Sequence, residues 1–588
     1  MAESGSLKAE RFSLKSVSNK LIAKARKLLS QEMKTRSHGQ PPAPAGDREK
    51  LFIGLAFPNR YYTAMSNLGF QAVYQLFNDQ PQTVCERVFW PDPEDLAEVR
   101  RTGTPLFTLE SQRPVRTFDI LAFSISYEND YPHLLQMMEL AGIPLLRQER
   151  KEGHPLIMAG GATVLMNPEP LAEFVDFFVI GEAEAIVAPL VRVLREGKLQ
   201  GRSKEELLNE LTALEGVYVP EFYSIAYRPE GTIESRTPRE NAPSRVRRVW
   251  LKNLNDALTA SSVLTPHTEL SDMFLMELSR GCHRRCRFCA SCYTYFPHRV
   301  REEPFLREMA LRDSNPGTKV GLVGAAISDY PDLITLGREV LQSRRTLSFS
   351  SLRVDSLTPE LADLVYDSGQ KTVTLAPEAG SERMRRVIGK GFTEEEIFRA
   401  AEILVDRGVR SFRLYFMIGL PEEKAEDIRG IVELAKKIRH HMRERSRGKK
   451  GAERILLSLN SFVPKPGTPF QWHPFENVRN LNEKIKIVER GVRQEKGVSV
   501  AADLPKWSYV QTLLARGDRR VGKLLLAVHR LNGNWPQAYR SVDVNPDFYV
   551  YRERGRDEIF PWDFIDHGIH KEWLWAEYQR ALQEGGNI

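Results

Sequence analysis

Short apolar segments alternate with amphipathic helical segments along two long stretches of this 588-residue chain, 50–196 and 273–463. Such alternation is typical of parallel β-sheets covered by helices. The sequence therefore predicts an α/β protein with two sheet domains. A polar connector at 197–265 lies between them, and an aromatic, mainly helical region at 499–588 follows.

The first stretch predicts a doubly wound, Rossmann-like domain over residues 50–196. Its expected strands are 51–57, 120–126, 156–161 and 177–181, and its expected helices are 67–77, 130–141 and 182–196. Ligands of such sheets bind at the carboxyl ends of the strands. We therefore predict that a cofactor is bound by residues at those ends, namely Ser126, Gly160, Gly161 and Gly181. The alternative for the glycines is simple turn geometry, because glycine adopts positive φ without strain.

The second stretch predicts a partial (β/α)6 barrel within residues 266–498. Its six expected strands are 274–278, 319–324, 346–350, 371–376, 412–418 and 454–460. Amphipathic helices are expected between them at 332–343, 359–368, 394–407 and 424–440. In barrels of this kind the chemistry takes place at the carboxyl ends of the strands.

Four of the five cysteines lie between positions 282 and 292, directly after the first strand of the second stretch. Cys282, Cys286 and Cys289 have the spacing C-x3-C-x2-C, with Phe288 just before the last of them. An iron–sulfur cube normally takes four thiolates. A loop with three leaves one iron open to a small molecule, which indicates a catalytic cluster. The alternatives are a tetrahedral zinc site that includes Cys292 and an incidental group of buried thiols.

This loop resembles the cluster loop of radical S-adenosylmethionine (radical SAM) enzymes. The resemblance implies a [4Fe-4S] cluster on Cys282, Cys286 and Cys289, with the amino and carboxylate groups of S-adenosylmethionine (SAM) on the open iron. Cys292 is then not needed as a ligand, and it is either a packing residue or a reactive thiol near the substrate.

The resemblance extends along the second stretch. The segment from Leu375 to Lys390, LAPEAGSERMRRVIGK, matches the pattern after the fourth barrel strand and implies SAM contacts from Glu378 and Ser381. The segment from Tyr415, YFMIGLPE, resembles the fifth strand near the adenine. Arg353 and Arg413 are expected near strand ends, where a guanidinium can fork onto the SAM carboxylate. An ordinary ion pair is the alternative for each arginine.

The first stretch resembles the cobalamin-binding domain that precedes the barrel in many radical SAM proteins. The segments that carry the resemblance are MSNLG from Met65, SYEN from Ser126, AGG from Ala159 and GEAE from Gly181. Many cobalamin domains ligate cobalt through a histidine, but residues 51–118 contain none. Either cobalamin binds here without a protein histidine, or the domain has lost the cofactor.

Residues 1–38 form a basic segment with apolar positions at helical spacing, and 39–49 read as a linker. The basic segment is expected to be a helix lying on the next domain, or else a nucleic-acid or membrane-surface contact. No run of 18 apolar residues predicts a membrane span, and no secretory signal is visible. Because the cysteines are clustered, a reducing cytoplasm is expected.

The expected function is reductive cleavage of SAM to a 5′-deoxyadenosyl radical, which takes hydrogen from an unknown substrate. Methyl transfer becomes the expected outcome if cobalamin binds. A reductant such as flavodoxin or ferredoxin is the expected partner. The net charge of +7 permits an anionic partner. The alternatives are therefore a nucleic-acid-binding protein with a structural or redox-sensing cluster and an RNA-modifying radical enzyme.

Overall fold

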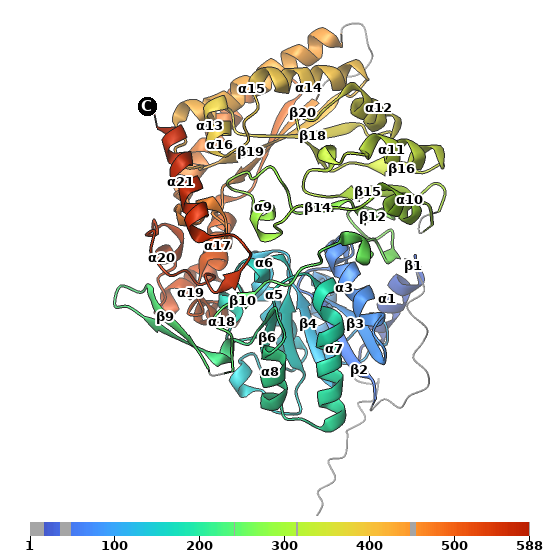
Figure 1. The fold of residues 1–588 in the computed structure, drawn as a ribbon, viewed down its shortest axis with the longest axis vertical. Coiled ribbons are helices and arrows are strands. Elements are labelled where there is room, and N and C mark those ends of the chain that lie inside the picture. The colour runs from blue at the N-terminus through green and yellow to red at the C-terminus, as the bar shows by residue number, and fades with distance from the viewer. Residues whose placement is uncertain (1–16, 36–48, 240, 313–314, 447–453, 587–588) are drawn as a thin grey trace, which may run out of the picture.

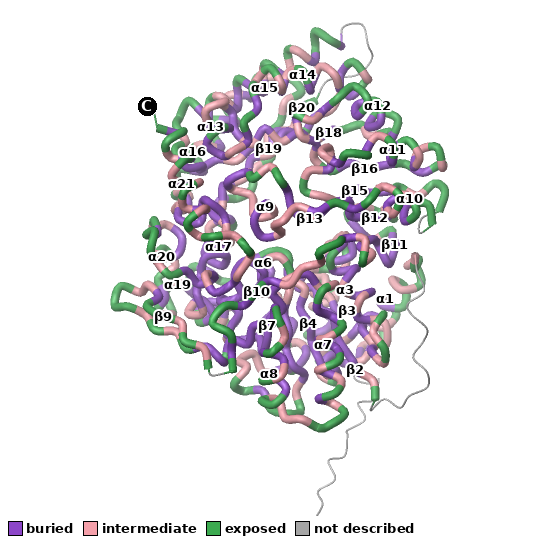
Figure 2. Tube along the Cα trace, viewed as in Figure 1, coloured by how far each residue is buried: buried purple, intermediate pink, exposed green. Residues whose placement is uncertain are grey.

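Two sheet domains lie one above the other, with the cysteine loop and helix α9 (Ala290–Thr294) between them (Figure 1). The computed structural model describes residues 17–35, 49–239, 241–312, 315–446 and 454–586. Within these ranges, none of the helices combines the length and apolar character that a membrane crossing needs. Buried residues run through the sheets of both domains and form one hydrophobic cluster (Figure 2).

The N-terminal domain holds a six-stranded sheet in the order β3-β2-β4-β5-β6-β7. All neighbours are parallel except the last pair, β6 and β7. The strands are β2 (Leu51–Phe57), β3 (Thr83–Phe89), β4 (Ile120–Ser124), β5 (Leu156–Gly160), β6 (Phe177–Val179) and β7 (Val217–Tyr218). The helices are α2 (Tyr61–Ala64), α3 (Leu68–Asn78), α4 (Pro93–Thr102), α5 (Tyr131–Leu140), α6 (Ala162–Met166), α7 (Ala183–Gln200) and α8 (Lys204–Thr212). The central strand β2 is buried at every position, as expected for a sheet covered on both faces.

The four strands expected in this domain are present, and two further strands were missed. β7 carries the sheet to Tyr218, beyond the predicted boundary at 196. β3 lies at the other edge, and its sequence holds two buried charged residues, Glu86 and Arg87. Arg87 pairs with Glu110 and with Glu32, whose carboxylates lie 2.7 Å from it. These partners are distant in sequence, so the local pattern of β3 does not read as a buried strand.

The second domain holds two parallel sheets, β12-β15-β16 and β17-β18-β19-β20-β21. The strands are β12 (Phe274–Glu277), β15 (Lys319–Val323), β16 (Thr346–Ser348), β17 (Ser351–Leu352), β18 (Thr372–Glu378), β19 (Ser411–Ile418), β20 (Arg454–Ser461) and β21 (Val498–Ala502). The helices are α10 (Glu303–Arg312), α11 (Leu333–Gln342), α12 (Pro359–Asp367), α13 (Glu382–Val387), α14 (Glu394–Asp406), α15 (Ala425–Arg445) and α16 (Val478–Val492).

All six strands expected here are present, but the expected strand 346–350 ends at Ser348 as β16. The chain then enters the other sheet as β17, at residues 351–352, which was not predicted. β21 was not predicted and extends the second sheet to Ala502, past the expected boundary at 498. Along β19 the buried positions alternate with less buried ones, so one face packs under helices and the other faces the interior of the partial barrel.

The C-terminal region is mainly helical, as predicted, and touches both sheet domains. Its helices are α17 (Pro505–Arg516), α18 (Val521–Arg530), α19 (Trp535–Ser541), α20 (Pro546–Val550) and α21 (Lys571–Gly585). Helix α18 packs on α5 of the N-terminal domain, while α21 packs on α13 of the second domain (Figure 1). Strand β22 (Ile565–Asp566) also pairs with β10 (Val246–Arg247) of the connector, which further holds the hairpin β8 (Tyr223–Tyr227) and β9 (Ile233–Pro238).

The basic N-terminal segment forms α1 (Asn19–Ser30) on the side of the N-terminal domain. Lys24 Nζ lies 3.0 Å from Asp92 Oδ2 and also pairs with Asp95. Strand β1 (Met33–Lys34) then pairs with β11 (Val263–Leu264) in the connector. The segment therefore lies on the next domain, as one of its two interpretations predicts. The expected linker falls mostly on residues 36–48, outside the described residues.

Candidate active site at the cysteine loop

The cysteine loop follows β12, at the carboxyl end of that strand. A short hairpin, β13 (Ser279–Arg280) with β14 (Arg299–Val300), brackets the loop at its base. Gly281 begins the loop with φ of +78°, and a Cβ atom there would lie 2.6 Å from the carbonyl oxygen of Tyr295. Only glycine fits this turn. The fold therefore places the loop at the carboxyl ends of the strands of the second domain, as the sequence predicted.

Four sulfur atoms gather in this loop. Cys282, Cys286 and Cys292 are buried, and Cys289 is half-buried. The thiol of Cys292 hydrogen-bonds to the sulfurs of Cys282 and Cys289, which lowers the pKa of Cys282 to about 6 and that of Cys289 to about 7. The same hydrogen bonds raise the pKa of Cys292. Burial raises the pKa of Cys286 to about 11. Thiolates are the form that binds metals, and the four thiols lie close enough to affect one another's ionisation.

The arrangement of these side chains does not favour a site for a single metal ion. In the described parts of the chain, no three histidine, cysteine, aspartate or glutamate side chains are grouped so that they could hold one ion. A tetrahedral zinc site needs four ligands close around one point, whereas an iron–sulfur cube distributes its thiolates over separate irons. The assignment of Cys282, Cys286 and Cys289 to a cluster stays a prediction that the donor set suits.

A cavity of about 580 Å³ lies between the N-terminal sheet and the cysteine loop. Its floor is the face of the sheet formed by Leu55, Ala122, Ser124, Met158, Gly160 and Val179. Its walls are α3 and α7, which contribute apolar residues at helical spacing, namely Gly69, Ala72, Val73 and Leu76 from α3 and Ala183, Ile186, Val187 and Leu190 from α7. Its far end reaches the second domain at Glu277, Ser279, Arg280, Ser291 and Tyr295.

The residues predicted to bind a cofactor in the N-terminal domain all line this cavity. They are Ser126, Gly160, Gly161 and Gly181. For two of the glycines, the alternative of turn geometry holds as well. Gly161 and Gly181 have φ of +109° and +146°, and a Cβ atom would lie 2.4 Å and 2.2 Å from backbone oxygens. Gly160 differs, because its nearest neighbour is 3.8 Å from the Cβ position. A side chain at Gly160 would therefore enter the cavity without backbone strain.

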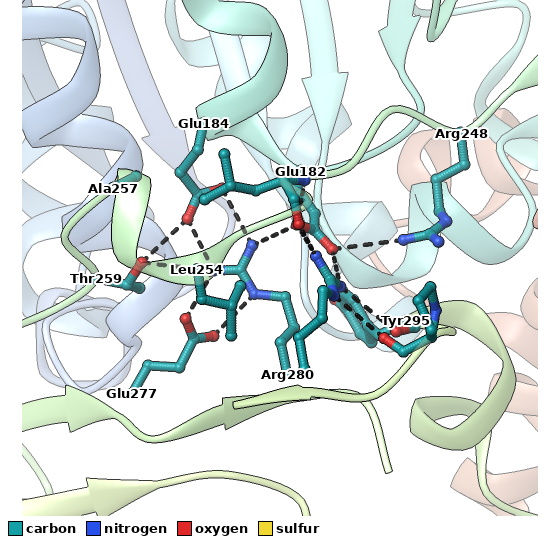
Figure 3. A network of polar contacts seen from close by, with 12 residues as sticks. Glu182, Glu184, Arg248, Leu254, Ala257, Thr259, Glu277, Arg280 and Tyr295 are labelled. Carbon is teal, nitrogen blue, oxygen red and sulfur yellow. Dashed lines mark hydrogen bonds and ion pairs between the residues drawn. The ribbon is translucent and has the colours of Figure 1, made fainter. Parts of the chain in front are cut away.

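A buried network of charges joins the two domains at the polar end of this cavity (Figure 3). Arg280, the residue before Gly281, contacts Glu182 and Glu184 of the N-terminal domain, each at 2.8 Å. It also lies 2.9 Å from Glu277 at the end of β12. Arg299 adds a 2.6 Å contact to Glu182. Burial raises the pKa of Glu184, but the guanidinium of Arg280 outweighs it and lowers the pKa to about 2. The carboxylates of Glu182 and Glu184 are thus held ionised, and with Arg280 they fix the base of the cysteine loop.

Two family models match this chain. Residues 276–435 match the model described as the radical SAM superfamily, and residues 69–220 match the model described as the N-terminal domain of radical SAM proteins. The chain belongs to the radical SAM superfamily. It is therefore a radical SAM superfamily enzyme, and its cysteine loop lies within the matched region.

Two curated relatives are similar in sequence. An uncharacterized protein of Methanocaldococcus jannaschii is 29% identical over 80% of this chain and 90% of its own length. An uncharacterized methyltransferase of Pyrococcus horikoshii is 24% identical over 48% of this chain and 58% of its own length.

Two solved structures are similar at a lower level. The radical SAM methyltransferase TsrM from Kitasatospora setae is 13% identical, with 69% of this chain and 72% of that chain covered and a TM-score of 0.44. The cobalamin-dependent SAM radical enzyme OxsB is 12% identical, with 91% and 79% covered and a TM-score of 0.42.

Within the radical SAM domain, Arg353 lies near two of the cysteines, and Glu378 is connected to them through Lys390. Arg353 follows β17 directly, and its charge acts on both Cys282 and Cys286. It also pairs with Asp355 at 2.8 Å, so the ion-pair alternative holds as well. Glu378 ends β18 and pairs at 2.9 Å with Lys390, whose charge acts on Cys286. The sequence analysis missed Lys390 as a site residue, although it closes the segment that matched the family pattern.

Of the three other predicted SAM contacts, only Arg413 is placed differently, while Ser381 and Tyr415 stay predictions. Arg413 is the third residue of β19 and is exposed, so it lies toward the amino end of that strand and not near its carboxyl end as expected. The hydroxyl of Ser381 caps α13 by accepting from the Met384 N–H, and it donates to Asp427. Tyr415 lies mid-strand and faces the barrel interior. The motif pattern could not show which end of a strand a residue occupies or which partner takes a hydroxyl.

Proposed function

We propose that this enzyme cleaves SAM reductively at a [4Fe-4S] cluster held by Cys282, Cys286 and Cys289. The observation that carries the proposal is the gathering of these sulfurs at the carboxyl end of β12, beside Arg353 and Glu378. The cluster, when bound, supplies one electron to the SAM sulfonium, which yields methionine and a 5′-deoxyadenosyl radical that takes hydrogen from a substrate C–H bond. A low-potential donor such as flavodoxin or ferredoxin is proposed as the source of that electron.

The side chains near the loop are chemically complementary to the carboxylate and ribose groups of SAM. The guanidinium of Arg353 can fork onto the methionine carboxylate. The carboxylate of Glu378 accepts from ribose hydroxyls, and Lys390 keeps it oriented at 2.9 Å. The N-terminal domain and the C-terminal helix α21 cover the loop from two sides, which excludes water from a reactive intermediate (Figure 1).

The test is anaerobic reconstitution with iron and sulfide, followed by dithionite and SAM. Wild-type enzyme is expected to form 5′-deoxyadenosine and methionine. The single variants Cys282→Ala, Cys286→Ala and Cys289→Ala are expected to form neither product. Cys85→Ala is the matched control, because Cys85 is a buried cysteine in β3 of the other domain. No 5′-deoxyadenosine from iron-loaded wild type contradicts the proposal.

We further propose that the cavity between the domains binds cobalamin and that methyl transfer is the outcome. The cavity is lined mainly by apolar residues of the sheet and of α3 and α7, with a few polar groups such as Ser124, Ser126 and Glu182. Among the described residues that line it, none is a histidine, so cobalamin would bind without a protein histidine on cobalt. The name of the Pyrococcus horikoshii relative, a methyltransferase, agrees with this outcome.

A bulky side chain placed in the cavity tests the cobalamin proposal. Wild type expressed with hydroxocobalamin is expected to copurify with corrin absorption bands. Gly160→Phe is expected to lose those bands and keep its iron, because the new ring enters the cavity without backbone strain. The control is Gly153→Phe, an exposed glycine outside this cavity with open space around its Cβ position. Wild type that carries iron but no corrin would refute the cobalamin proposal alone.

A further inference from the structure

Cys292 is the one loop cysteine to which the proposed function gives no role. It lies in α9 with 3% of its surface exposed. Its thiol contacts the sulfurs of two proposed ligands, Cys282 and Cys289. A cysteine that only fills space needs apolar neighbours and no sulfur contacts. Cys292 instead lies within the sulfur set itself.

The backbone of the loop explains this position. The N–H of Cys289 donates to the carbonyl of Cys286 at 3.0 Å, and the N–H of Cys292 donates to the carbonyl of Cys289 at 3.1 Å. Each of these hydrogen bonds closes a turn over one C-x2-C interval, and Cys289, with an extended backbone, joins the two turns. The backbone therefore holds Cys292 close to Cys289 in the same way that it holds Cys289 close to Cys286.

An iron–sulfur cube normally takes four thiolates, and the proposed set supplies three. We propose that the Cys292 thiolate binds the fourth iron while SAM is absent and that SAM displaces it. This inference rests on the proposed function. In the exchange, the iron–sulfur bond to Cys292 breaks, and bonds form from iron to the amino nitrogen and carboxylate oxygen of SAM. No electron is transferred, and the released side chain takes up one proton from solvent.

The fourth thiolate gives the enzyme a closed resting cluster. An iron with an open position is exposed to water and to loss from the cube. A ligand from the same short loop occupies that position without any movement of another domain. Because binding of SAM must then displace a ligand, Cys292 weakens SAM binding and strengthens retention of the cluster.

Mössbauer spectroscopy on enzyme loaded with ⁵⁷Fe tests the resting state directly. SAM-free wild type is expected to show only iron sites with all-sulfur ligation, and a distinct site with nitrogen and oxygen ligands is expected only after SAM is added. SAM-free Cys292→Ala is expected to show a distinct fourth iron at once. A distinct fourth iron in SAM-free wild type overturns the inference, and this measurement needs no variant to fold.

SAM affinity gives a second readout. The shift of the reduced cluster's electron paramagnetic resonance signal is titrated with SAM. Cys292→Ala is expected to bind SAM on the order of tenfold more tightly than wild type, because no thiolate competes for the iron. Cys292→Ser keeps the size of the side chain with a weaker ligand, and it is expected to lie between the two. Equal affinity in all three proteins overturns the inference.

Two further variants separate this inference from the function on which it rests. Cys85→Ala is expected to leave the Mössbauer spectrum and the SAM affinity unchanged. The double variant Cys282→Ala/Cys292→Ala is expected to lose the cluster. If the double variant loses iron while Cys292→Ala matches wild type, only the role of Cys292 is refuted. If the double variant keeps a complete cluster, the proposed function itself is refuted.

Discussion

At the scale of single residues, Glu182 shows how a buried negative charge is stabilised beneath the cysteine loop. Its side chain is 2% exposed, yet it accepts hydrogen bonds from Arg248, Arg280 and Arg299. Burial raises its pKa, but the hydrogen bond from Arg299 and the charge of Arg280 outweigh burial and lower it. A buried ion pair adds little by itself, but removing one partner leaves a buried charge without compensation. Glu182 is therefore costly to change.

We predict that Glu182→Gln lowers the free energy of unfolding by about 3 kcal/mol. Because Arg280 directly precedes the loop, the variant should also retain less iron after gel filtration. Urea denaturation of the cluster-free protein and iron analysis of the reconstituted protein measure the two effects. The control is Glu215→Gln, whose partner Arg247 has 74% of its side chain exposed, so a loss below about 1 kcal/mol is expected. Equal losses in the two variants would contradict this account.

At the scale of elements, sequence periodicity located most of the fold. β2 was predicted to the residue, and α14 and α12 within one residue at each end, because apolar spacing and N-terminal caps mark them. β3 was not predicted, because the partners that neutralise Arg87 come from distant segments. β7 has only two residues. Strand pairing between distant segments leaves no local signal, so these elements needed the structure.

The site was predictable to a similar degree. The cysteine loop was placed correctly because parallel strands put their following loops at one edge. The cavity-lining residues of the N-terminal domain were found for the same reason. The ion network with Arg280 was not found, since a contact between residues about 100 positions apart is set by how the domains meet. Arg413 was wrongly expected near the carboxyl end of its strand, and the hydrogen bond from Ser381 to Asp427 was not foreseen, because a motif does not reveal the partner or the depth of a side chain.

Helix α21 is the element that secures the cysteine loop from the other side. Arg287, in the loop, lies 2.6 Å from Glu584 and 3.3 Å from Glu577 of this helix. Trp573 packs near Tyr293 of α9 and under the guanidinium of Arg285. The loop is thus held between the ion network of the N-terminal domain and the last helix of the chain. Its geometry depends on segments from both ends of the sequence.

At the scale of the whole molecule, the C-terminal region fastens the two domains together. Asn167, after α6, donates to the carbonyls of Ala515 and Gly517 at 3.0 and 2.8 Å. Glu169 is fully buried and pairs with Arg236 of the connector at 3.2 Å and with Arg519 of the C-terminal region at 3.0 Å. Three parts of the chain therefore meet at one carboxylate. We expect the N-terminal domain and the C-terminal region to unfold together.

The pH dependence of stability tests this junction. Burial raises the pKa of Glu169, but Arg236 and Arg519 outweigh it and lower the pKa to about 2, from 4.5 as the ordinary value. A carboxyl group with a lowered pKa in the folded state stabilises the protein above its unfolded pKa, and this contribution is lost as the pH falls through the folded pKa. Glu169 should therefore contribute on the order of 3 kcal/mol at pH 7. That contribution should decline from about pH 4.5 toward pH 2.

We predict that Glu169→Gln lowers the thermal midpoint of the cluster-free protein markedly at pH 7 and that the difference from wild type shrinks toward pH 3. The reason is that protonated glutamic acid and glutamine are both neutral, so the two proteins become alike as Glu169 takes up its proton. Calorimetry between pH 7 and pH 3 measures the difference. Glu221→Gln is the control, since the side chain of Glu221 is 46% exposed, and its small effect should not vary with pH. A difference for Glu169→Gln that stays constant with pH would show that the loss comes from packing and not from the charge that joins the three segments.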